Sequence, residues 1–400
     1  MNILLLSFYY QPDLSAGSFR AEALVRALRG QLPAGSQIDV VTTLPNRYAG
    51  YTQDAQTTEF QEGVSIHRVQ LPEHKSGVVD QSFAFMAYTR HALRISRKGH
   101  YDLVVATSGR LMTAVLAAWI ASRQKRALYL DIRDIFVDTI SDVFPKRVTC
   151  LAKPVFSWLE RRTVLYAGRV NLVSQGFSEY FSSRYPGKDF TYFTNGIDPE
   201  FLAWKEPPEG PLAAHRPVRV LYAGNIGEGQ GLHTIIPDLA DRLGAQVHFI
   251  VIGGGGRLEA LKARCQEAAL SNVEILPPMK RQALIEAYAG ADILFLHLND
   301  YDAFKKVLPS KIFEYAATGK PIWAGVAGYA KDFLAEEVEN ASVFSPCNTE
   351  EALMALKVLS LRTVQRKVFC LKFARESLMQ AMAQDIVKLI GGVARNRGAQ

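Results

Sequence analysis

Two side chains of opposite charge, Lys311 and Glu314, lie three residues apart in a segment that predicts a short helix. Pro309 fixes φ where a helix can begin, Ser310 is placed to cap the helix, and Gly319 ends it. Residues three apart lie on neighbouring rows of a helix face. A cation near phosphates and a carboxylate that accepts from ribose hydroxyls would suit a nucleoside diphosphate. The same spacing also fits a surface helix that carries an ion pair.

Glycine-rich turns separate apolar strands from helices at three places. The residues expected near a phosphate are Gly17 after the apolar run 2–10, Gly224, Asn225 and Gly227 after the run 218–222, and Gly253 and Gly254 after the run 247–252. Glycine lets the backbone approach a diphosphate, and the following helix N-terminus supplies partial positive charge. Each turn alone also fits a tight turn without a ligand, but two in one half of the chain favour a binding site.

Two further loops carry polar side chains at the carboxyl ends of expected strands. Ser108 and Arg110 follow the strand 101–107, while Asp131 and Arg133 lie at the end of the strand 127–132 and just after it. Ligands of open α/β sheets bind at this end of the strands. Paired charges such as Asp131 and Arg133 are as often structural as catalytic, so both interpretations stay open here.

Composition and length predict a globular protein with two α/β domains. The chain has 400 residues, 48% of them hydrophobic and 21% charged, and a chain of this length usually forms two cores. The domains are expected at 1–200 and 201–375, with a proline-rich linker around 199–217. Four scattered cysteines, no recognisable signal peptide and no apolar run long enough to span a bilayer predict a cytoplasmic protein.

The formal net charge is +7, and five of these charges fall in residues 1–200. A basic balance favours an acidic partner, although many basic proteins are merely soluble. The segment 82–100 predicts a helix with an apolar stripe and a basic face that includes Arg90 and Arg94. Such a helix suits peripheral contact with an anionic membrane at the inner face of the plasma membrane, or simple packing on a core with a solvated face.

The segment from Pro309 to Pro321 resembles the signature PSK-I-x-E-Y-x-A-x-GKP of retaining glycosyltransferases of family GT4. The similar branch includes bacterial N-acetyl-fucosamine transferases of surface polysaccharide assembly. The turns at Gly17 and Gly224 and the run Asn195-Gly196-Ile197-Asp198 are similar to further motifs of this family. The resemblance implies the GT-B fold, in which two Rossmann-like domains face a central cleft and the C-terminal helix, here about 376–400, packs back onto the first domain.

The resemblance also implies roles for the residues. Lys311 and Glu314 would be catalytic. The donor would lie on Gly17, Gly224, Asn225, Gly227, Gly253, Gly254, Ser310, Lys311 and Glu314, and the acceptor near Ser108, Arg110, Asp131 and Arg133. Backbone amides at Gly17 and at 224–227, together with Lys311, would stabilise the leaving diphosphate. Glu314 would hold the ribose.

The implied reaction is transfer of a sugar from a nucleotide sugar, by default UDP-linked, to a lipid-linked or glycan acceptor with retention. The nucleotide sugar is a co-substrate, so no cofactor, no metal and no nucleic-acid partner is expected. Asp300-Tyr301-Asp302 also matches the DxD metal pattern of another transferase fold, but such acidic pairs are common in loops.

Two other functions stay open, and three departures from the family pattern motivate the second of them, a member without catalysis. Asn225 and Gln230 stand where the wider family has Arg and Lys, and Lys306 stands where it has a glutamate. A sugar-nucleotide epimerase with this fold, or a member that binds the nucleotide sugar without catalysis, would also fit.

Overall fold

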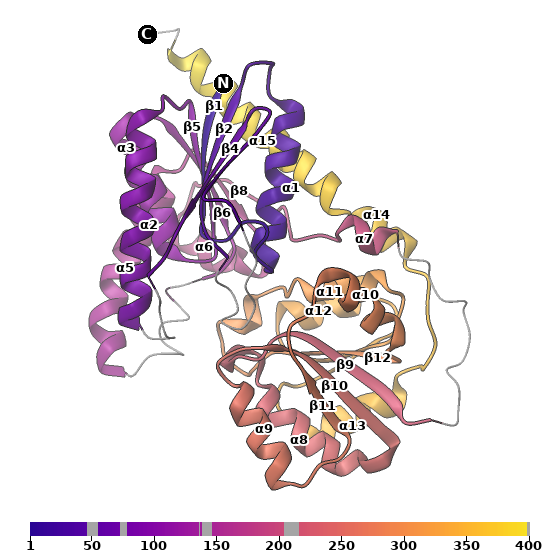
Figure 1. The fold of residues 1–400 in the computed structure, drawn as a ribbon. Coiled ribbons are helices and arrows are strands. Elements are labelled where there is room, and N and C mark those ends of the chain that lie inside the picture. Colours follow the sequence, from indigo (N-terminus) through magenta and orange to yellow (C-terminus); the bar gives the residue numbers. More distant parts are fainter. Residues whose placement is uncertain (46–54, 73–77, 136, 138–145, 204–215, 398–400) are drawn as a thin grey trace. The chain divides into compact units, whose positions relative to one another are not determined.

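The computed structural model describes residues 1–45, 55–72, 78–135, 137, 146–203 and 216–397. Residues 204–215 of the expected linker therefore lie outside the described residues. The chain forms two compact units (Figure 1). Unit 1 comprises Met1–Asn195 with Arg375–Gln400, and unit 2 comprises Gly196–Ala374.

Unit 1 contains a mainly parallel sheet with the strand order β3-β4-β2-β1-β5-β6-β7-β8. The strands are β1 (Asn2–Ser7), β2 (Gln37–Thr43), β3 (Thr58–Gln61), β4 (Val64–Val69), β5 (Leu103–Ser108), β6 (Ala127–Ile132), β7 (Arg169–Leu172) and β8 (Phe190–Thr191). Only the β3–β4 pair among these strands is antiparallel. The strand order reverses between β1 and β5, so the loops after these two strands lie where sheets of this kind bind ligands.

Helices cover both faces of this sheet (Figure 1). They are α1 (Ala16–Gln31), α2 (Val78–Lys98), α3 (Leu111–Gln124), α5 (Lys146–Tyr166), α6 (Ser178–Arg184) and α15 (Arg375–Arg397). The C-terminal α15 packs beside α1, and its fully buried Met379 and Ile386 belong to the same apolar core as Ile3 and Leu24. The sequence places α15 after unit 2, yet its apolar side chains complete the core of unit 1.

Unit 2 contains a parallel sheet with the order β11-β10-β9-β12-β13-β14. Its strands are β9 (Val218–Asn225), β10 (Val247–Gly254), β11 (Val273–Leu276), β12 (Ile293–His297), β13 (Ile322–Gly325) and β14 (Ala341–Phe344). Its helices are α7 (Pro199–Leu202), α8 (Leu232–Leu243), α9 (Leu258–Glu267), α10 (Arg281–Gly290), α11 (Lys311–Ala317), α12 (Tyr329–Glu337), α13 (Thr349–Val358) and α14 (Lys367–Lys372). Separate apolar cores on the two faces explain why β12 is buried along its whole length.

The strand order of unit 2 reverses between β9 and β12. The carboxyl end of β9 carries Gly224 and Asn225, so the first glycine turn of this unit begins at the position where open sheets bind ligands. These two sheets confirm the predicted α/β fold class. No helix of the described residues is both long enough and apolar enough to cross a membrane.

Candidate active site

Lys311 and Gly224 meet at the carboxyl end of β9. Lys311 is the first residue of α11, and its side chain lies so close to Gly224 that a Cβ at that position would collide with Nζ. The same Nζ lies 5.3 Å from the centre of the Tyr222 ring, and Gly224 has a φ of +147°, which L side chains rarely adopt. Glycine at 224 therefore both permits the backbone conformation and makes room for a cation.

The second glycine turn packs directly on the first. Gly253 pairs with Gly224 and Gly254 pairs with Asn225 in the β9–β10 ladder. A Cβ on Gly253 would collide with the Gly224 carbonyl oxygen, and the Ile226 amide donates to the Gly254 carbonyl over 2.9 Å. The two turns thus form one backbone surface at this end of the sheet.

The amide side chains that stand in place of the family's Arg and Lys bond to each other. Asn225 Nδ2 donates to Gln230 Oε1 over 2.7 Å, and the Gly227 amide donates to the same oxygen over 3.3 Å. The amides of Ile226 and Gly227 thus both have acceptors inside the protein. The 224–227 amides are therefore expected to stabilise a diphosphate less, and Lys311 is expected to stabilise it more.

His297, at the end of β12, holds the first glycine turn of unit 2 in place. Its Nδ1 lies 2.7 Å from the Gln230 carbonyl, and its Nε2 lies 2.9 Å from the Cys347 amide. Because the Cys347 N–H can only donate, Nε2 must be the acceptor and Nδ1 the protonated nitrogen that donates to Gln230. A neutral His297 therefore holds the glycine turn to the loop after β14.

The folded protein is expected to lose stability through His297 as the pH falls. Burial lowers the pKa of His297 to about 4 from its ordinary 6.5. The unfolded chain takes up this proton near pH 6.5 and the folded chain only near pH 4, so the stabilisation is complete above 6.5 and is lost between these values. The loss is about 3 kcal/mol. Urea unfolding at several pH values should show this dependence in the native chain and a flatter one in His297→Gln. His248→Gln is the control and should keep the pH dependence of the native chain. If His297→Gln keeps it too, the assignment is wrong.

Glu314 lies on α11 with its side chain mostly buried, at 14% exposure. Its Oε1 accepts from Arg281 Nη1 over 3.1 Å, and its Oε2 accepts from the Tyr288 hydroxyl over 3.2 Å. Arg281 also pairs with Asp198. Burial disfavours the charge of Arg281, but the carboxylates of Glu314 and Asp198 more than offset it and raise its pKa. A carboxylate offers about four acceptor positions, so Glu314 retains capacity for ribose hydroxyls.

Ser310 occupies the N-cap position of α11 but does not cap the helix with its side chain. Its backbone is itself helical, with φ −60° and ψ −25°, whereas a capping serine normally needs an extended backbone. The prediction that Ser310 caps the helix is therefore wrong. As a donor contact, Ser310 stays a prediction.

Asp300 and Asp302 both form ion pairs with one lysine. Lys305 Nζ lies 2.8 Å from Asp302 and 3.7 Å from Asp300, all three side chains being exposed. Within the described residues no group of three His, Cys, Asp or Glu side chains could hold a metal ion. The expectation of metal-independent chemistry stays a prediction.

In unit 1, Gly17 and Arg133 come together. Gly17 lies in the first turn of α1, and a Cβ on it would collide with the Arg133 guanidinium. The buried Nε of Arg133 has no hydrogen-bond partner in the described part of the chain. Burial lowers the pKa of Arg133 to about 10, against the opposing effect of Asp131, so it keeps its charge at neutral pH. A cation at a helix N-terminus beside a glycine is suited to an anionic group.

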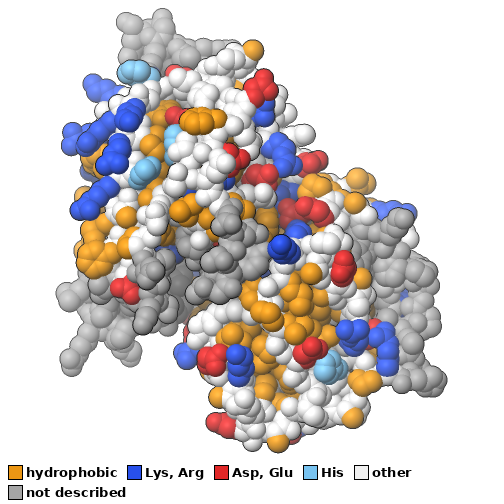
Figure 2. Space-filling model, viewed as in Figure 1, with side chains coloured by type: hydrophobic (Ala, Val, Ile, Leu, Met, Phe, Trp, Pro, Cys, Tyr) orange, Lys and Arg blue, Asp and Glu red, His pale blue; other side chains and the backbone are white. Residues whose placement is uncertain are grey.

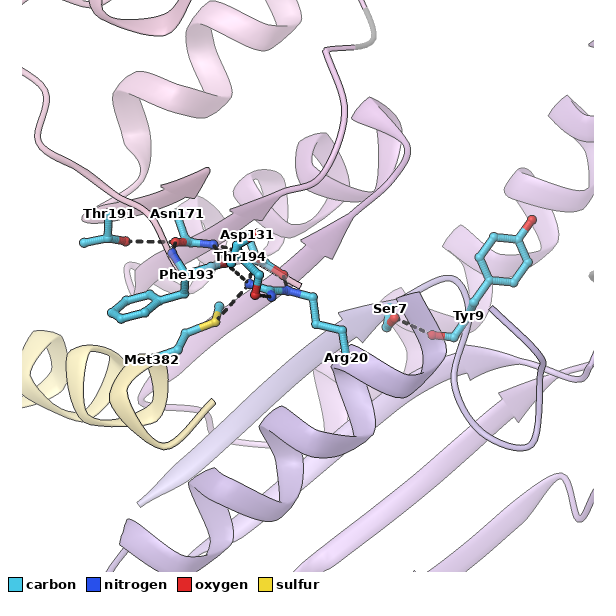
Figure 3. A network of polar contacts seen from close by, with 9 residues as sticks. All are labelled: Ser7, Tyr9, Arg20, Asp131, Asn171, Thr191, Phe193, Thr194 and Met382. Carbon is cyan, nitrogen blue, oxygen red and sulfur yellow. Dashed lines mark hydrogen bonds and ion pairs between the residues drawn. The ribbon is translucent and has the colours of Figure 1, made fainter. Parts of the chain in front are cut away.

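Asp131, unlike Arg133, is surrounded by hydrogen-bond donors of the protein itself (Figure 3). It is fully buried and accepts from Arg20 Nε over 2.8 Å, from Arg20 Nη2 over 2.9 Å and from Asn171 Nδ2 over 2.8 Å. Arg20 also donates to the carbonyls of Phe193 and Thr194. All of these interactions stay within unit 1, and they favour the structural alternative for Asp131 over contact with an acceptor.

Ser108 is the last residue of β5 and Arg110 lies in the loop after it, next to the loop after β1. The Ser108 hydroxyl donates to the Arg110 carbonyl, and Arg110 Nη2 donates to the Tyr9 hydroxyl over 2.9 Å. The Arg110 guanidinium lies 4.2 Å from the centre of the Phe8 ring. The loops after β1 and β5 are thus joined at the reversal point of the sheet, and an acceptor role for these residues stays a prediction.

Two family models match the chain, one described as a glycosyl transferase 4-like domain over residues 17–196 and one as glycosyl transferases group 1 over residues 206–367. Together they cover more than four fifths of the chain. WcaI of Escherichia coli K12, a glycosyl transferase assigned to colanic acid biosynthesis, is 29% identical over 174 residues, which span 42% of this chain and 42% of WcaI.

Solved structures of other proteins share the fold at low sequence identity. Sucrose-phosphate synthase of Thermosynechococcus elongatus has a TM-score of 0.74 at 15% identity, covering 98% of this chain and 100% of that one. WaaG, a glycosyltransferase involved in lipopolysaccharide biosynthesis, has a TM-score of 0.66 at 14% identity, covering 98% of each chain. HepE of Anabaena in complex with UDP-glucose has a TM-score of 0.62 at 15% identity, with 100% of each chain covered. These likenesses confirm the predicted GT-B fold, and with the two family matches they show that this chain belongs to the GT4-type glycosyltransferases.

Proposed function

We propose that the protein transfers a sugar, with retention, from a UDP-linked donor to a lipid-linked or glycan acceptor in bacterial surface polysaccharide synthesis. The observation that carries this proposal is the placement of Lys311 against Gly224 at the reversal point of the unit 2 sheet, with Glu314 on the same helix. The HepE structure with UDP-glucose supports the nucleotide, and WcaI supports the pathway class.

The chemical task of the site is to stabilise the nucleoside diphosphate as it leaves. Negative charge grows on the oxygen that joins the diphosphate to the sugar while their bond breaks. A cation fixed in advance beside this oxygen lowers the activation barrier. Lys311 has the position for this role, because its ammonium group already lies against the backbone that a diphosphate would approach. A fixed lysine would remove the need for a metal ion.

Acceptor-dependent release of UDP tests this proposal. The full chain would be incubated with a panel of UDP-sugars, with and without polyprenyl-diphosphate-linked sugar acceptors, and with EDTA. We expect release that needs the acceptor and survives EDTA, and a product with the anomeric configuration of the donor. Conversion of the nucleotide sugar without acceptor would indicate an epimerase, and tight binding without any turnover would indicate the non-catalytic alternative.

Glu314→Ala is expected to weaken donor binding through loss of a charged acceptor for the ribose, a hydrogen bond of roughly 1.5–3 kcal/mol. Calorimetric titration with UDP measures this effect. Glu314→Gln keeps the shape of the side chain and should show an intermediate loss. Since Glu314 also binds Arg281, the control is Arg281→Lys, which keeps a cation there. Unchanged affinity in Glu314→Ala would remove Glu314 from the donor site.

A further inference from the structure

We propose that Tyr222 is a positioning residue for sugar transfer, because its buried ring holds the ammonium group of Lys311 against Gly224. The inference rests on the proposed function, in which Lys311 stabilises the departing diphosphate. Tyr222 acts through Lys311 and is not expected to touch the donor or the acceptor. Removal of the ring should therefore impair the reaction through the placement of one cation.

Gly224 leaves a space beside the Tyr222 ring, and Lys311 occupies that space. Alternate residues of a strand project from the same face, so residues 222 and 224 of β9 share one face of the sheet. Tyr222 packs in the core on that face, whereas Leu221 and Ala223 pack in the core on the opposite face. A side chain at 224 would collide with Lys311 Nζ. The ammonium group thus takes the place of the side chain that glycine lacks.

The backbone of Lys311 is anchored on the opposite face of the sheet. Phe313 on the same helix is fully buried in the core that contains Ala223, and the Ala223 amide donates to the Tyr315 hydroxyl over 3.2 Å. These contacts fix α11 on β9. They do not fix Nζ, because a lysine side chain is a flexible four-carbon stem. The Tyr222 ring supplies a constraint at the far end of that stem.

The contact between Lys311 and Tyr222 has the geometry of a cation–π interaction. Nζ lies 5.3 Å from the ring centre, and Tyr222 is only 2% exposed. The attraction of a cation to a ring face is stronger where water is excluded. The hydroxyl of the same side chain donates to the Asn225 carbonyl over 2.7 Å. Because the ring contacts the cation and the hydroxyl contacts the turn, variants can separate the two contributions.

A cation that is ordered before the reaction contributes more to the rate than one that must be ordered during it. The ring lies on one side of the Lys311 ammonium group and leaves N–H bonds on its other side for the diphosphate. Without the ring, the stem has to be ordered as negative charge develops. The rate constant kcat should then fall, while the affinity for the intact donor changes much less.

Tyr222→Phe and Tyr222→Leu separate the ring from the hydroxyl. The phenylalanine variant keeps the ring and should keep most of kcat, although it loses the hydrogen bond to Asn225. The leucine variant should lower kcat about 3–30-fold, the range that corresponds to a cation–π contact. Calorimetric titration with the nucleotide sugar, in the absence of acceptor, should show a much smaller change. An equal loss of kcat in both variants would assign the effect to the hydroxyl and overturn the proposal.

Fluorinated phenylalanines at position 222 test the electrostatic part of the contact at nearly constant size. Fluorine withdraws electrons from the ring, so the negative face that attracts a cation becomes weaker with each fluorine atom. We expect kcat to fall stepwise from phenylalanine to its mono-, di- and trifluoro analogues. In the Lys311→Ala background the same series should have no effect. A flat series in the native background, or the same fall without Lys311, would contradict the proposal.

Phe249→Leu is the matched control for the loss of a buried ring. Phe249 lies in the same core as Tyr222, is 1% exposed and packs against the rings of Phe295 and Trp323. The variant should unfold at a lower temperature, as Tyr222→Leu should, but the folded protein should keep its kcat. If Phe249→Leu lowers kcat as much as Tyr222→Leu does, the loss comes from the core and the proposal is wrong.

Acetylation of Lys311 measures the contact without any transferase activity. Lys and Arg side chains lie at many places on the visible surface of both units (Figure 2), and Lys262, 44% exposed, serves as the internal standard. Mass spectrometry should find Lys311 acetylated severalfold faster in Tyr222→Leu than in the native chain or Tyr222→Phe, because the amine is no longer held. Equal rates in all three would overturn the inference even if the chain transfers sugar. Faster labelling in Tyr222→Leu of a chain that transfers no sugar would support the contact and reject the proposed function.

Discussion

Lys311→Ala is expected to lower kcat for sugar transfer by about 10²–10³-fold, the range seen when one preorganised stabiliser of developing charge is removed. The donor affinity should change much less, because the additional negative charge on the leaving oxygen develops only as the bond to the sugar breaks. The reason lies in the position of Nζ, which is held against Gly224 and over the Tyr222 ring. Steady-state kinetics measures kcat, and calorimetric titration with the nucleotide sugar in the absence of acceptor measures the donor affinity.

Three variants make this prediction specific. Lys311→Arg should restore only part of kcat, because a planar fork and a compact ammonium group are not equivalent. Lys305→Ala and Lys306→Ala are the controls in the neighbouring loop. Lys305 already pairs with Asp302, so its loss should matter little. If Lys311→Ala turns over normally while Lys305→Ala or Lys306→Ala does not, the phosphate cation lies in that loop instead.

Asp131→Ala is expected to lower the free energy of unfolding of unit 1 by about 3–5 kcal/mol, because Arg20 would keep a buried charge without its partner. Both side chains are fully buried, and the pair links α1 to the end of β6. Calorimetric unfolding of the full chain measures the change. Asp102→Ala, at an exposed aspartate whose carboxylate accepts from the Asn2 amide, is the control. The double variant Arg20→Met/Asp131→Leu should recover much of the loss, since no lone charge remains. Equal losses at Asp131 and Asp102 would contradict the structural role.

The elements of the fold follow well from local sequence patterns. The apolar runs before Gly17, Gly224 and Gly253 become β1, β9 and β10, because strands covered on both faces need continuous apolar side chains. Lys311 and Glu314 lie on one helix as their spacing predicts. A local pattern also identified the turn at Gly224, where glycine is required by its φ and by the approach of Lys311.

The partners of these residues could not be predicted, because they come from distant parts of the chain. Arg281 reaches Glu314 from α10, and Arg20 reaches Asp131 from 111 residues away. Buried charge pairs leave no periodic signal, so nothing near Asp131 indicated that its partner was Arg20. The failed cap at Ser310 has a different cause: the residue type was right, but its backbone is already helical.

A crystal structure with UDP bound would show directly whether Lys311 and Glu314 hold the nucleotide. We expect the diphosphate at the carboxyl end of β9, within hydrogen-bonding distance of Lys311 Nζ, and the ribose hydroxyls donating to Glu314. Two results would contradict this expectation. UDP could bind elsewhere, or its diphosphate could lie on this turn but be held by Lys305 or Lys306 while Lys311 stays on the Tyr222 ring.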